Sequence, residues 1–424
     1  MGMIYDPIVL GKGYILPGTD IGTERINDNV IAEAPSGSGK TTGIVFPTIA
    51  RMENMNLIAE YAKEEEAVQH ASILKAKGYV IDYLNVRSPE RSTVSFDPLR
   101  YIENFTDVEA LSDMVIHSTL EDPKEPYWTM KSKPLHNSLC ISTMAYKKNA
   151  GMVHVLRAFE ETLPVEGECA GFSVRMDDRM NEIRKAAPHS LAVREYDAWR
   201  SLPFRTASCV RDTLAAALSN VFPESIRTLM KTKPCIDFEK NTKIKHALFI
   251  ISDASEPGQS YYTNLFWSTA IRQLRRIADR STDHHLSRPV RLIFGDFGCT
   301  SPIRNFEREI SVFRSAGISC LIILQSQSQL ESVYGSDKST IIRQNCPVQA
   351  YLSGGMDEKS CSLVSRRMNL PIEDVMYAKI GKVFIMQAGR KPVIVDRYDT
   401  YNSREYKEYL GMITREKSGQ EAFD

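Results

Sequence analysis

The stretch IAEAPSGSGKTTG, residues 31–43, most constrains what this chain can fold into. A short apolar run precedes a turn of small residues, and a lysine and two threonines that can open a helix follow the turn. This order predicts a strand, a phosphate-binding loop and a helix, because small residues let successive backbone N–H groups close around phosphate oxygens at a helix N-terminus. The lysine supplies a point charge and the next hydroxyl supplies a magnesium ligand.

We therefore predict that this loop binds ATP with Mg²⁺. Ala34 stands where the usual motif has its first glycine, and its small side chain satisfies the same need. The alternative is a glycine-rich turn between a strand and a helix that binds nothing. The residues predicted to bind the nucleotide are Ala34, Pro35, Ser36, Gly37, Ser38, Gly39, Lys40, Thr41 and Thr42.

The composition excludes several classes of protein. Lys plus Arg and Asp plus Glu both number 53, so any nucleic-acid contact must come from a local patch rather than from bulk charge. The eight cysteines include no C-x-x-C pair, which favours reduced thiols over a zinc site or a disulfide framework. No apolar run approaches the roughly 18 residues that span a bilayer, and the N-terminus lacks a signal-peptide pattern. We expect a soluble, cytoplasmic chain.

Short apolar segments alternate with helical stretches toward both ends of the sequence. Such alternation predicts an α/β fold with a mostly parallel central sheet that helices cover. The strand candidates are residues 30–32, 56–60, 78–84, 246–252, 290–295, 318–325 and 382–386. The polar last stretch, residues 401–424, predicts a helix that frays into a tail.

Between residues 103 and 207 no strand candidate of this quality occurs, and helical spacing replaces it, as in Leu135, Leu139 and Ser142. We interpret this stretch as an all-helical insertion between two parts of one nucleotide-binding domain, residues 1–102 and 208–424. The insertion has 13 Lys and Arg against 16 Asp and Glu, a balance of −3. That balance favours protein partners over a phosphate backbone.

A second motif is expected where an apolar strand ends in acids that hold magnesium and polarise water. The segment VRLIFGDFG, residues 290–298, has this position but ends in Gly295 and Asp296 instead of two consecutive acids. Asp296 is a candidate metal ligand and catalytic base, although one carboxylate cannot easily do both jobs. The alternative is that Asp296 caps the turn after the strand.

Several segments together resemble the type IV secretion coupling proteins, the TraG/TraD-like group of hexameric ATPases with a RecA-like fold. LIAEYAKEEE is similar to the family's D-P-K-G-E segment, FDPLRYI to its N-P-L, and EPYWTM to its D-P-F-W. The order and spacing of these pieces are more specific than the phosphate loop by itself. The other matching segments are VLGKGYIL, NDNVIAEAPSGSGKTTGIVFPTI, FGDFGCTSPIRNFEREISVFRSAGISCLIILQSQSQL and RQNCPVQAYLSGG.

The resemblance implies a role for each matching residue. Lys40 is implied as the phosphate lysine, and Thr41 and Asp296 as residues that hold the metal, with Asp296 at the position of the family's catalytic glutamate. Arg314 matches the arginine that reaches a neighbouring subunit's γ-phosphate, and Gln325 the residue that senses that phosphate. The alternatives are a solvated helix arginine and a strand-end amide that satisfies backbone groups.

The departures from the family pattern point to weakened hydrolysis. Tyr61 replaces the aspartate of D-P-K-G-E, and Gly295 replaces the metal aspartate. On this interpretation Gly295→Asp raises turnover. The family's membrane-spanning N-terminal segments are also missing from the 39 residues before Lys40, so this is a soluble branch or an upstream region has been left off.

Our first functional hypothesis is a coupling-protein-like ATPase, a hexamer that acts in the cytoplasm or, through its partners, at the inner face of the membrane. The resemblance implies a relaxase or other DNA-processing and secretion-substrate proteins, and channel components, as partners, and it leaves direct DNA binding open. The alternative is a nucleotide-binding scaffold that assembles or gates a secretion or mobilisation complex without turnover. A third hypothesis is a metabolic phosphate-loop kinase. The large helical insertion and the segments that contain Arg314 and Gln325 argue against it.

Overall fold

The computed structural model describes residues 4–18, 26–117, 126–163, 173–299 and 301–411 of the chain. The chain divides into two compact units. We call residues 1–87, 237–255 and 270–424 the sheet unit, and residues 88–236 and 256–269 the helical unit. The insertion boundaries predicted from the sequence, 103 and 207, stay a prediction.

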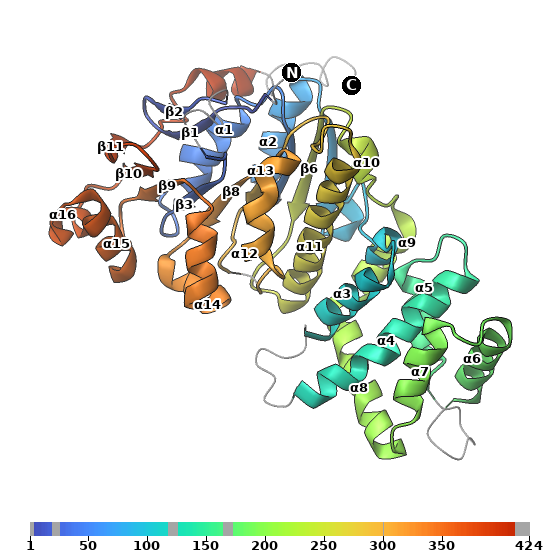
Figure 1. The fold of residues 1–424 in the computed structure, drawn as a ribbon. Coiled ribbons are helices and arrows are strands. Elements are labelled where there is room, and N and C mark those ends of the chain that lie inside the picture. Colours follow the sequence, from blue (N-terminus) through green and yellow to red (C-terminus); the bar gives the residue numbers. More distant parts are fainter. Residues whose placement is uncertain (1–3, 19–25, 118–125, 164–172, 300, 412–424) are drawn as a thin grey trace. The chain divides into compact units, whose positions relative to one another are not determined.

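A nine-stranded sheet with the order β11-β10-β9-β3-β8-β7-β4-β6-β5 forms the centre of the sheet unit (Figure 1). The seven strands from β9 to β5 in that order pair in parallel, and β10 and β11 are antiparallel additions at one edge. The sheet strands are β3 (Val30–Glu33), β4 (Asn56–Tyr61), β5 (Val80–Asn85), β6 (His246–Ile251), β7 (Val290–Phe294), β8 (Ile318–Leu324), β9 (Val348–Leu352), β10 (Lys382–Gln387) and β11 (Val393–Asp396). A separate hairpin pairs β1 (Ile8–Gly11) with β2 (Tyr14–Leu16).

The predicted α/β class with a mostly parallel sheet is confirmed. Each apolar segment named from the sequence overlaps a strand, although four of the segments extend one or two residues beyond it. Strands β4, β6, β7 and β8 are buried along their whole length. Continuous apolar runs of this kind are what a parallel sheet covered on both faces requires. The short strands β9 and β11 were not among the predicted ones.

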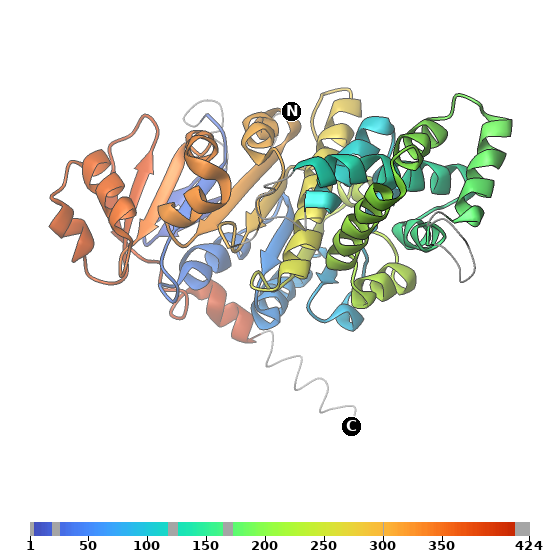
Figure 2. The same ribbon diagram turned by 90° about the horizontal axis from the view of Figure 1, so that it is seen from below.

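Helices cover both faces of this sheet. Alternate strand residues face opposite sides, so Ile293 packs with the helices that follow β3 and β4, while Phe294 joins an aromatic cluster with Phe297 and Phe306. Figure 2 shows the sheet between its helical layers from a second side. The helices of this unit include η1 (Thr41–Val45), α1 (Phe46–Ile49), α2 (Glu64–Ala76), α10 (Phe238–Asn241), α12 (Phe306–Glu309), α13 (Phe313–Ala316), α14 (Gln327–Gln344), α15 (Glu358–Met368), α16 (Ile372–Met376) and the later part of α11 (Pro257–Arg280).

The described residues of the helical unit form helices and short loops, in line with the helical spacing of the sequence. Leu135, Leu139 and Ser142 are fully buried in α4, which is its longest helix. Hydrogen bonds join α4 to its neighbours, as from Ser138 Oγ to Ala192 O at 2.8 Å and from Ser132 Oγ to Val210 O at 3.1 Å. Its described α-helices are α3 (Phe105–Ile116), α4 (Pro126–Tyr146), α5 (Met152–Glu160), α6 (Val174–Ala186), α7 (Leu191–Arg200), α8 (Phe204–Val221), α9 (Glu224–Thr232) and the start of α11.

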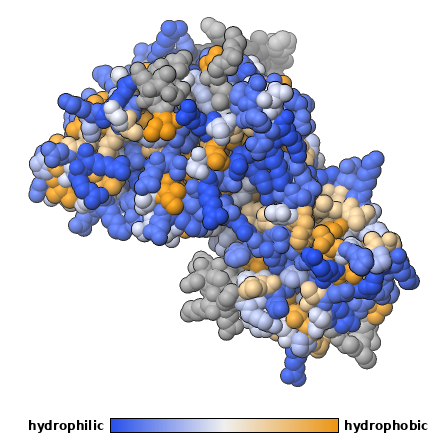
Figure 3. Space-filling model, viewed as in Figure 1, coloured by the Kyte–Doolittle hydropathy of each residue, from blue (hydrophilic) through white to orange (hydrophobic). Residues whose placement is uncertain are grey.

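The tail expected over residues 401–424 is helical at residues 404–411, and its last part, 412–424, lies outside the described residues. The face shown in Figure 3 is mostly hydrophilic, and hydrophobic residues are exposed at scattered places on both units. Among the described helices, none is both long enough and apolar enough to cross a membrane.

Candidate nucleotide site

The loop between β3 and η1, residues 34–42, has the form that the sequence predicts. Ala34 is fully buried, and its N–H donates to Leu324 O of the neighbouring strand β8 at 3.0 Å, so the loop accommodates the Cβ of alanine where the motif usually has glycine. Gly37 and Gly39 adopt φ of 76° and 87°, in the left-handed region that favours glycine. We call residues 34–42 the phosphate loop.

The interior of the phosphate loop is tied to its own backbone. Ser38 N–H and Oγ both bond to Pro35 O, at 3.3 and 2.7 Å. Lys40 Nζ donates to Ala34 O at 2.8 Å, which folds the lysine back across the loop. Burial lowers the pKa of Lys40, and the nearby carboxylate of Asp296 acts most strongly in the opposite direction.

Thr41 and Thr42 open the helix after the loop and are both half-buried. Thr42 Oγ1 donates to Gly39 O at 3.3 Å. Ser36 and Gly37 are exposed at the tip of the loop, and a Cβ built on Gly37 meets no atom within 4 Å. The loop thus has room on its open side for a ligand of phosphate size.

Asp296 and Gln325 reach the same place from two other strands. Asp296 follows β7 and Gln325 follows β8, at the carboxyl ends of parallel strands, where ligands of such sheets bind. Burial raises the pKa of Asp296, while the positive charge of Lys40 and a hydrogen bond from Gln325 act to lower it. A lysine, a carboxylate and an amide from three segments therefore form one polar cluster.

Cys299 also belongs to this cluster and was not predicted from the sequence. Its Sγ accepts hydrogen bonds from Gln325 Nε2 at 3.3 Å and from Gln329 Nε2 at 3.0 Å. Burial and the charge of Asp296 raise the pKa of the thiol, so it remains protonated at neutral pH. The repeated glutamines at 325 and 329 were the available signal, because Gln325 directly follows β8 and Gln329 lies in the first turn of α14.

Gly295 is required by the approach of the neighbouring strand. A Cβ at this position would lie 2.4 Å from the backbone oxygen of Glu60, at the end of β4. The Glu60 side chain is buried and accepts a hydrogen bond from Ser252 Oγ at 2.8 Å. The sequence pattern calls for an acid at position 295. Its side chain would fit there only after a shift of the backbone.

Tyr61 does not take the place of an acid beside the phosphate loop. Its side chain packs into the core on the α2 face, against Phe249, and its hydroxyl pairs with Nδ1 of His70 at 2.6 Å. Burial raises the pKa of Tyr61 and lowers that of His70 to about 3, so both groups are neutral at physiological pH. The interpretation of Tyr61 as a lost site acid finds no support in this position.

A buried ion pair lies directly before the phosphate loop and was not predicted. Glu33, the last residue of β3, accepts from Arg343 Nη2 of α14 at 2.8 Å and also from Ser360 Oγ of α15. Both partners of the ion pair are almost fully buried. Arg343 Nη1 also donates to Tyr351 of β9 at 2.7 Å, so the network fixes the strand that carries the loop against three neighbours.

Arg314 does not lie near the polar cluster, because it is at the opposite ends of the parallel strands. It is exposed on α13, which precedes the amino end of β8, whereas Gln325 follows the carboxyl end of the same strand. The structure therefore does not bring Arg314 to the polar cluster of its own chain. An exposed arginine at this end is free to contact a second molecule.

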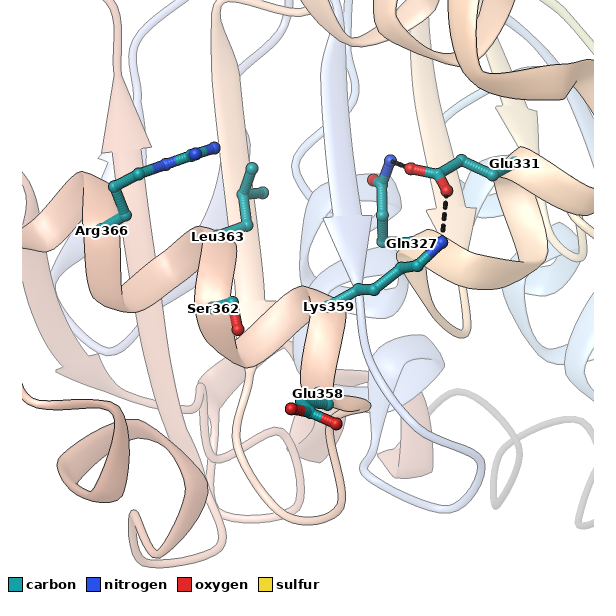
Figure 4. Close-up of a pocket in the computed structure, with 7 residues that line it drawn as sticks. All are labelled: Gln327, Glu331, Glu358, Lys359, Ser362, Leu363 and Arg366. Carbon is teal, nitrogen blue, oxygen red and sulfur yellow. Dashed lines mark hydrogen bonds and ion pairs between the residues drawn. The ribbon is translucent and has the colours of Figure 1, made fainter.

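A hollow of about 450 Å³ lies between α14 and α15 (Figure 4). Glu331 connects its two walls, because its carboxylate accepts from Gln327 at 2.6 Å and from Lys359 at 2.8 Å. None of the predicted site residues lines it, so we do not assign it to the nucleotide. Its lining residues are Gln327, Glu331, Glu358, Lys359, Ser362, Leu363 and Arg366. Within the described parts of the chain, no group of three or more His, Cys, Asp and Glu side chains is arranged to hold a metal without a ligand's help.

Solved structures with the same fold include the bacterial conjugative coupling protein TrwB in a trigonal form with sulphate. That match has a TM-score of 0.61 and 12% identity, and covers 94% of this chain and 95% of TrwB. TrwB with the non-hydrolysable ATP analogue ADPNP gives a TM-score of 0.60, 11% identity and coverage of 94% of both chains. VirB4 of Thermoanaerobacter pseudethanolicus gives 0.55 and 12%, with coverage of 94% of this chain and 97% of VirB4.

The likeness to these structures identifies the sheet unit as a RecA-like phosphate-loop fold. A comparison with curated proteins finds no match. The model of the type IV secretory system conjugative DNA transfer family matches residues 10–368, which is most of the chain and includes the phosphate loop, Asp296 and Gln325. The chain belongs to the type IV secretory system conjugative DNA transfer family.

Proposed function

We propose that this protein is a coupling-protein-like ATPase of a type IV secretion or conjugative DNA-transfer system, and that it hydrolyses ATP slowly. One observation carries the proposal: Lys40, Asp296 and Gln325 converge beside a phosphate loop in a chain of the conjugative DNA-transfer family. Complexes of TrwB with ADP and Mg²⁺ and with non-hydrolysable ATP and GTP analogues support a nucleotide with Mg²⁺ as the ligand.

The residues of the loop fit a polyphosphate. Left-handed glycines at 37 and 39 direct successive peptide groups around one concavity, and Lys40 adds a charge that offsets crowded phosphate oxygens. Thr41 and Asp296 are the proposed residues for the metal, since hydroxyl and carboxylate oxygens suit Mg²⁺.

In the proposed mechanism, bound Mg-ATP supplies the phosphoanhydride and the metal charge. Asp296 orients water and accepts its proton, and its raised pKa favours this role over that of an ordinary surface carboxylate. The same carboxylate is also proposed to serve the metal, and this double task is the reason that we propose slow hydrolysis. Gln325 holds the Asp296 carboxylate by a hydrogen bond and so links its position to the end of β8. Arg314 acts on the nucleotide of the next subunit in a ring.

The proposed partners are a relaxase or other DNA-processing and secretion-substrate proteins, together with channel components. The helical insertion is the proposed protein-contact region, supported by its net charge of −3 over residues 103–207. The proposed assembly is a hexamer that acts in the cytoplasm or at the inner face of the membrane through its partners.

A second candidate is a scaffold that binds ATP without cleaving it. Gly295 favours this candidate, because an acid is missing where the second motif needs one and the backbone of Glu60 occupies the space. The two candidates differ in turnover and not in nucleotide binding.

The decisive experiment compares wild type with Lys40→Ala and Asp296→Asn. We expect Mg-ADP binding by calorimetry in wild type and Asp296→Asn, and none in Lys40→Ala, because the lysine charge is lost. Phosphate release should fall by about a hundredfold in Asp296→Asn relative to a slow wild-type rate. Wild-type turnover at the level of an assay blank, with intact ADP binding, would select the scaffold. Equal ADP affinity in wild type and Lys40→Ala would remove the site.

A further inference from the structure

The chain that follows β11 crosses the phosphate loop. Arg397, the first residue after β11, donates its backbone N–H to Gly381 O at 2.7 Å. Its side-chain Nη1 donates to Ser38 O at 2.5 Å. A half-buried guanidinium is thus held against the phosphate loop by a segment near the C-terminal end of the sheet unit.

Two glycines make room for this arginine. A Cβ on Gly39 would lie 2.3 Å from Nη1 of Arg397, and a Cβ on Gly43 would lie 2.7 Å from its Cγ. Gly39 and Gly43 are four residues apart, and Gly43 N–H donates to Gly39 O at 2.7 Å, so they occupy the same side of one helical turn. The arginine side chain fills the groove that this pair leaves.

The segment that carries Arg397 is anchored to the helix after the phosphate loop. Thr400 is buried, and its hydroxyl donates to Thr42 O. Arg51 forms an ion pair with Glu405 at 2.6 Å and donates to the Tyr398 hydroxyl at 3.2 Å. These bonds hold the segment in place independently of Arg397.

The side chain of Arg397 contacts a carbonyl oxygen rather than a carboxylate. Across the described residues, its side chain has the hydrogen bond to Ser38 and no ion pair. Asp399 is near enough to feel the charge, but the pKa of Asp399 is lowered chiefly by a hydrogen bond from Asn402. Among the described residues, the guanidinium of Arg397 therefore has no carboxylate partner beside the loop.

The bond to Ser38 O acts on a particular peptide group. Ser38 C=O and Gly39 N–H belong to the same peptide, and the backbone of the described residues contains no cis peptide bond. In a trans peptide the C=O and the N–H point in opposite directions. A guanidinium on the carbonyl side therefore leaves Gly39 N–H directed away from the arginine, and it polarises the peptide so that the N–H becomes a stronger donor.

We propose that Arg397 is a positioning residue for the phosphate loop, which fixes and polarises the Ser38–Gly39 peptide so that Gly39 N–H binds a nucleotide phosphate. This inference rests on the proposed nucleotide binding. It adds a role for the segment after β11, in which the end of the sheet unit sets the affinity of a loop more than 350 residues earlier in the chain.

The test measures binding of Mg-ADP, inorganic pyrophosphate and adenosine to Arg397→Gln, Arg397→Lys and wild type by calorimetry. We expect Arg397→Gln to bind ADP and pyrophosphate about tenfold more weakly, since a charge-assisted hydrogen bond is lost, with adenosine unchanged. Arg397→Lys should recover much of the loss. Lys391→Gln, which removes an exposed charge from the turn between β10 and β11, is the matched control and should bind as wild type does.

A second readout follows the peptide itself. With ¹⁵N-glycine labelling, the Gly39 amide resonance should shift in Arg397→Gln and stay in place in Lys391→Gln, because only the first change alters the Ser38 carbonyl partner. If Arg397→Gln does not fold, Arg397→Met decides, because methionine keeps an apolar stem against Gly43 but removes the charge. A shifted Gly39 amide with weaker ADP binding supports the proposal, and wild-type values for both overturn it.

The outcomes separate this inference from the proposed function. If wild type binds ADP and Lys40→Ala does not, but folded Arg397→Gln binds ADP with wild-type affinity, the positioning role is wrong and the nucleotide site stands. Loss of adenosine and ADP binding by the same factor would also overturn it, since a phosphate-directed peptide cannot produce that result. If wild type binds no nucleotide, the proposed function and this inference fall together.

Discussion

Gly295 is interpreted differently from the sequence and from the structure. In the sequence it marks a missing acid, and the expectation was that an aspartate would restore turnover. In the structure a side chain at 295 meets the Glu60 carbonyl at 2.4 Å. The glycine is thus a packing requirement, whatever the rate of hydrolysis.

We predict that Gly295→Ala and Gly295→Asp each lower the free energy of unfolding by about 1–3 kcal/mol, the usual cost of overpacking, and that Gly295→Asp does not raise phosphate release. Urea denaturation and a phosphate assay measure the two effects. Gly411→Ala is the matched control, because a Cβ there meets no atom within 4 Å. Unchanged stability with faster turnover in Gly295→Asp would show that the strand ends adjust easily.

The Tyr61–His70 pair predicts a pH dependence of stability. Burial lowers the pKa of His70 from 6.5 to about 3, so the unfolded chain binds a proton between these values and the folded chain does not. Stability from this group is complete above pH 6.5 and is lost as the pH falls toward 3.

Between pH 7.5 and 5.5, wild type should therefore lose about 1.4 kcal/mol more than His70→Asn, which cannot titrate. Chemical denaturation at both pH values gives the comparison, and other acidic and basic groups cancel between the two proteins. Equal losses in wild type and variant would mean that His70 is not kept neutral by its burial.

At the scale of elements, the buried Glu33–Arg343 pair ties β3 to α14 and, through Ser360, to α15. Strand β3 carries the phosphate loop and α14 begins two residues after Gln325, so this network connects the two sides of the candidate site. Its main effect is to fix their relative position.

Arg343→Met should lower the free energy of unfolding by about 3–5 kcal/mol, because Glu33 would remain buried and charged without its partner. The double variant Glu33→Gln with Arg343→Met should lose less than the single one, since no unpaired charge is left. Denaturant unfolding of wild type, both single variants and the double variant completes the cycle. Additive losses would show that the two side chains stabilise the fold independently.

At the scale of the whole molecule, the residues proposed to act on the nucleotide lie at the two opposite ends of the parallel strands. The phosphate loop and its cluster lie at the carboxyl ends of the strands, while Arg314 is exposed at the amino end of β8. A ring with head-to-tail contacts is the arrangement that can bring such opposite ends together.

Arg314→Ala should therefore keep wild-type ADP affinity and lose phosphate release. Mixing it with Lys40→Ala, which has the arginine but no working loop, should restore roughly a quarter of wild-type turnover if subunits assemble at random head to tail. Each variant assayed separately is the control. A mixture no more active than its components, although it co-assembles, would place the action of Arg314 within its own chain or remove it.

The sequence by itself determined the parts that depend on local pattern. The phosphate loop is a contiguous run whose residue types suffice to predict its geometry, and apolar segments of fixed length predicted the buried strands β4, β6, β7 and β8. The segments that resemble the family also gave Asp296 and Gln325, whose strands the sheet places side by side.

Only the tertiary structure decided which distant residues meet the loop. Gly295 faces Glu60, Tyr61 turns into the core, Glu33 pairs with Arg343, and Arg397 covers the loop from the far end of the chain. The physical reason is that strand neighbours and side-chain faces follow from the sheet order, in which consecutive strands need not be adjacent. A pattern of residue types does not fix that order, because the same short apolar strands can be arranged in several ways with similar burial.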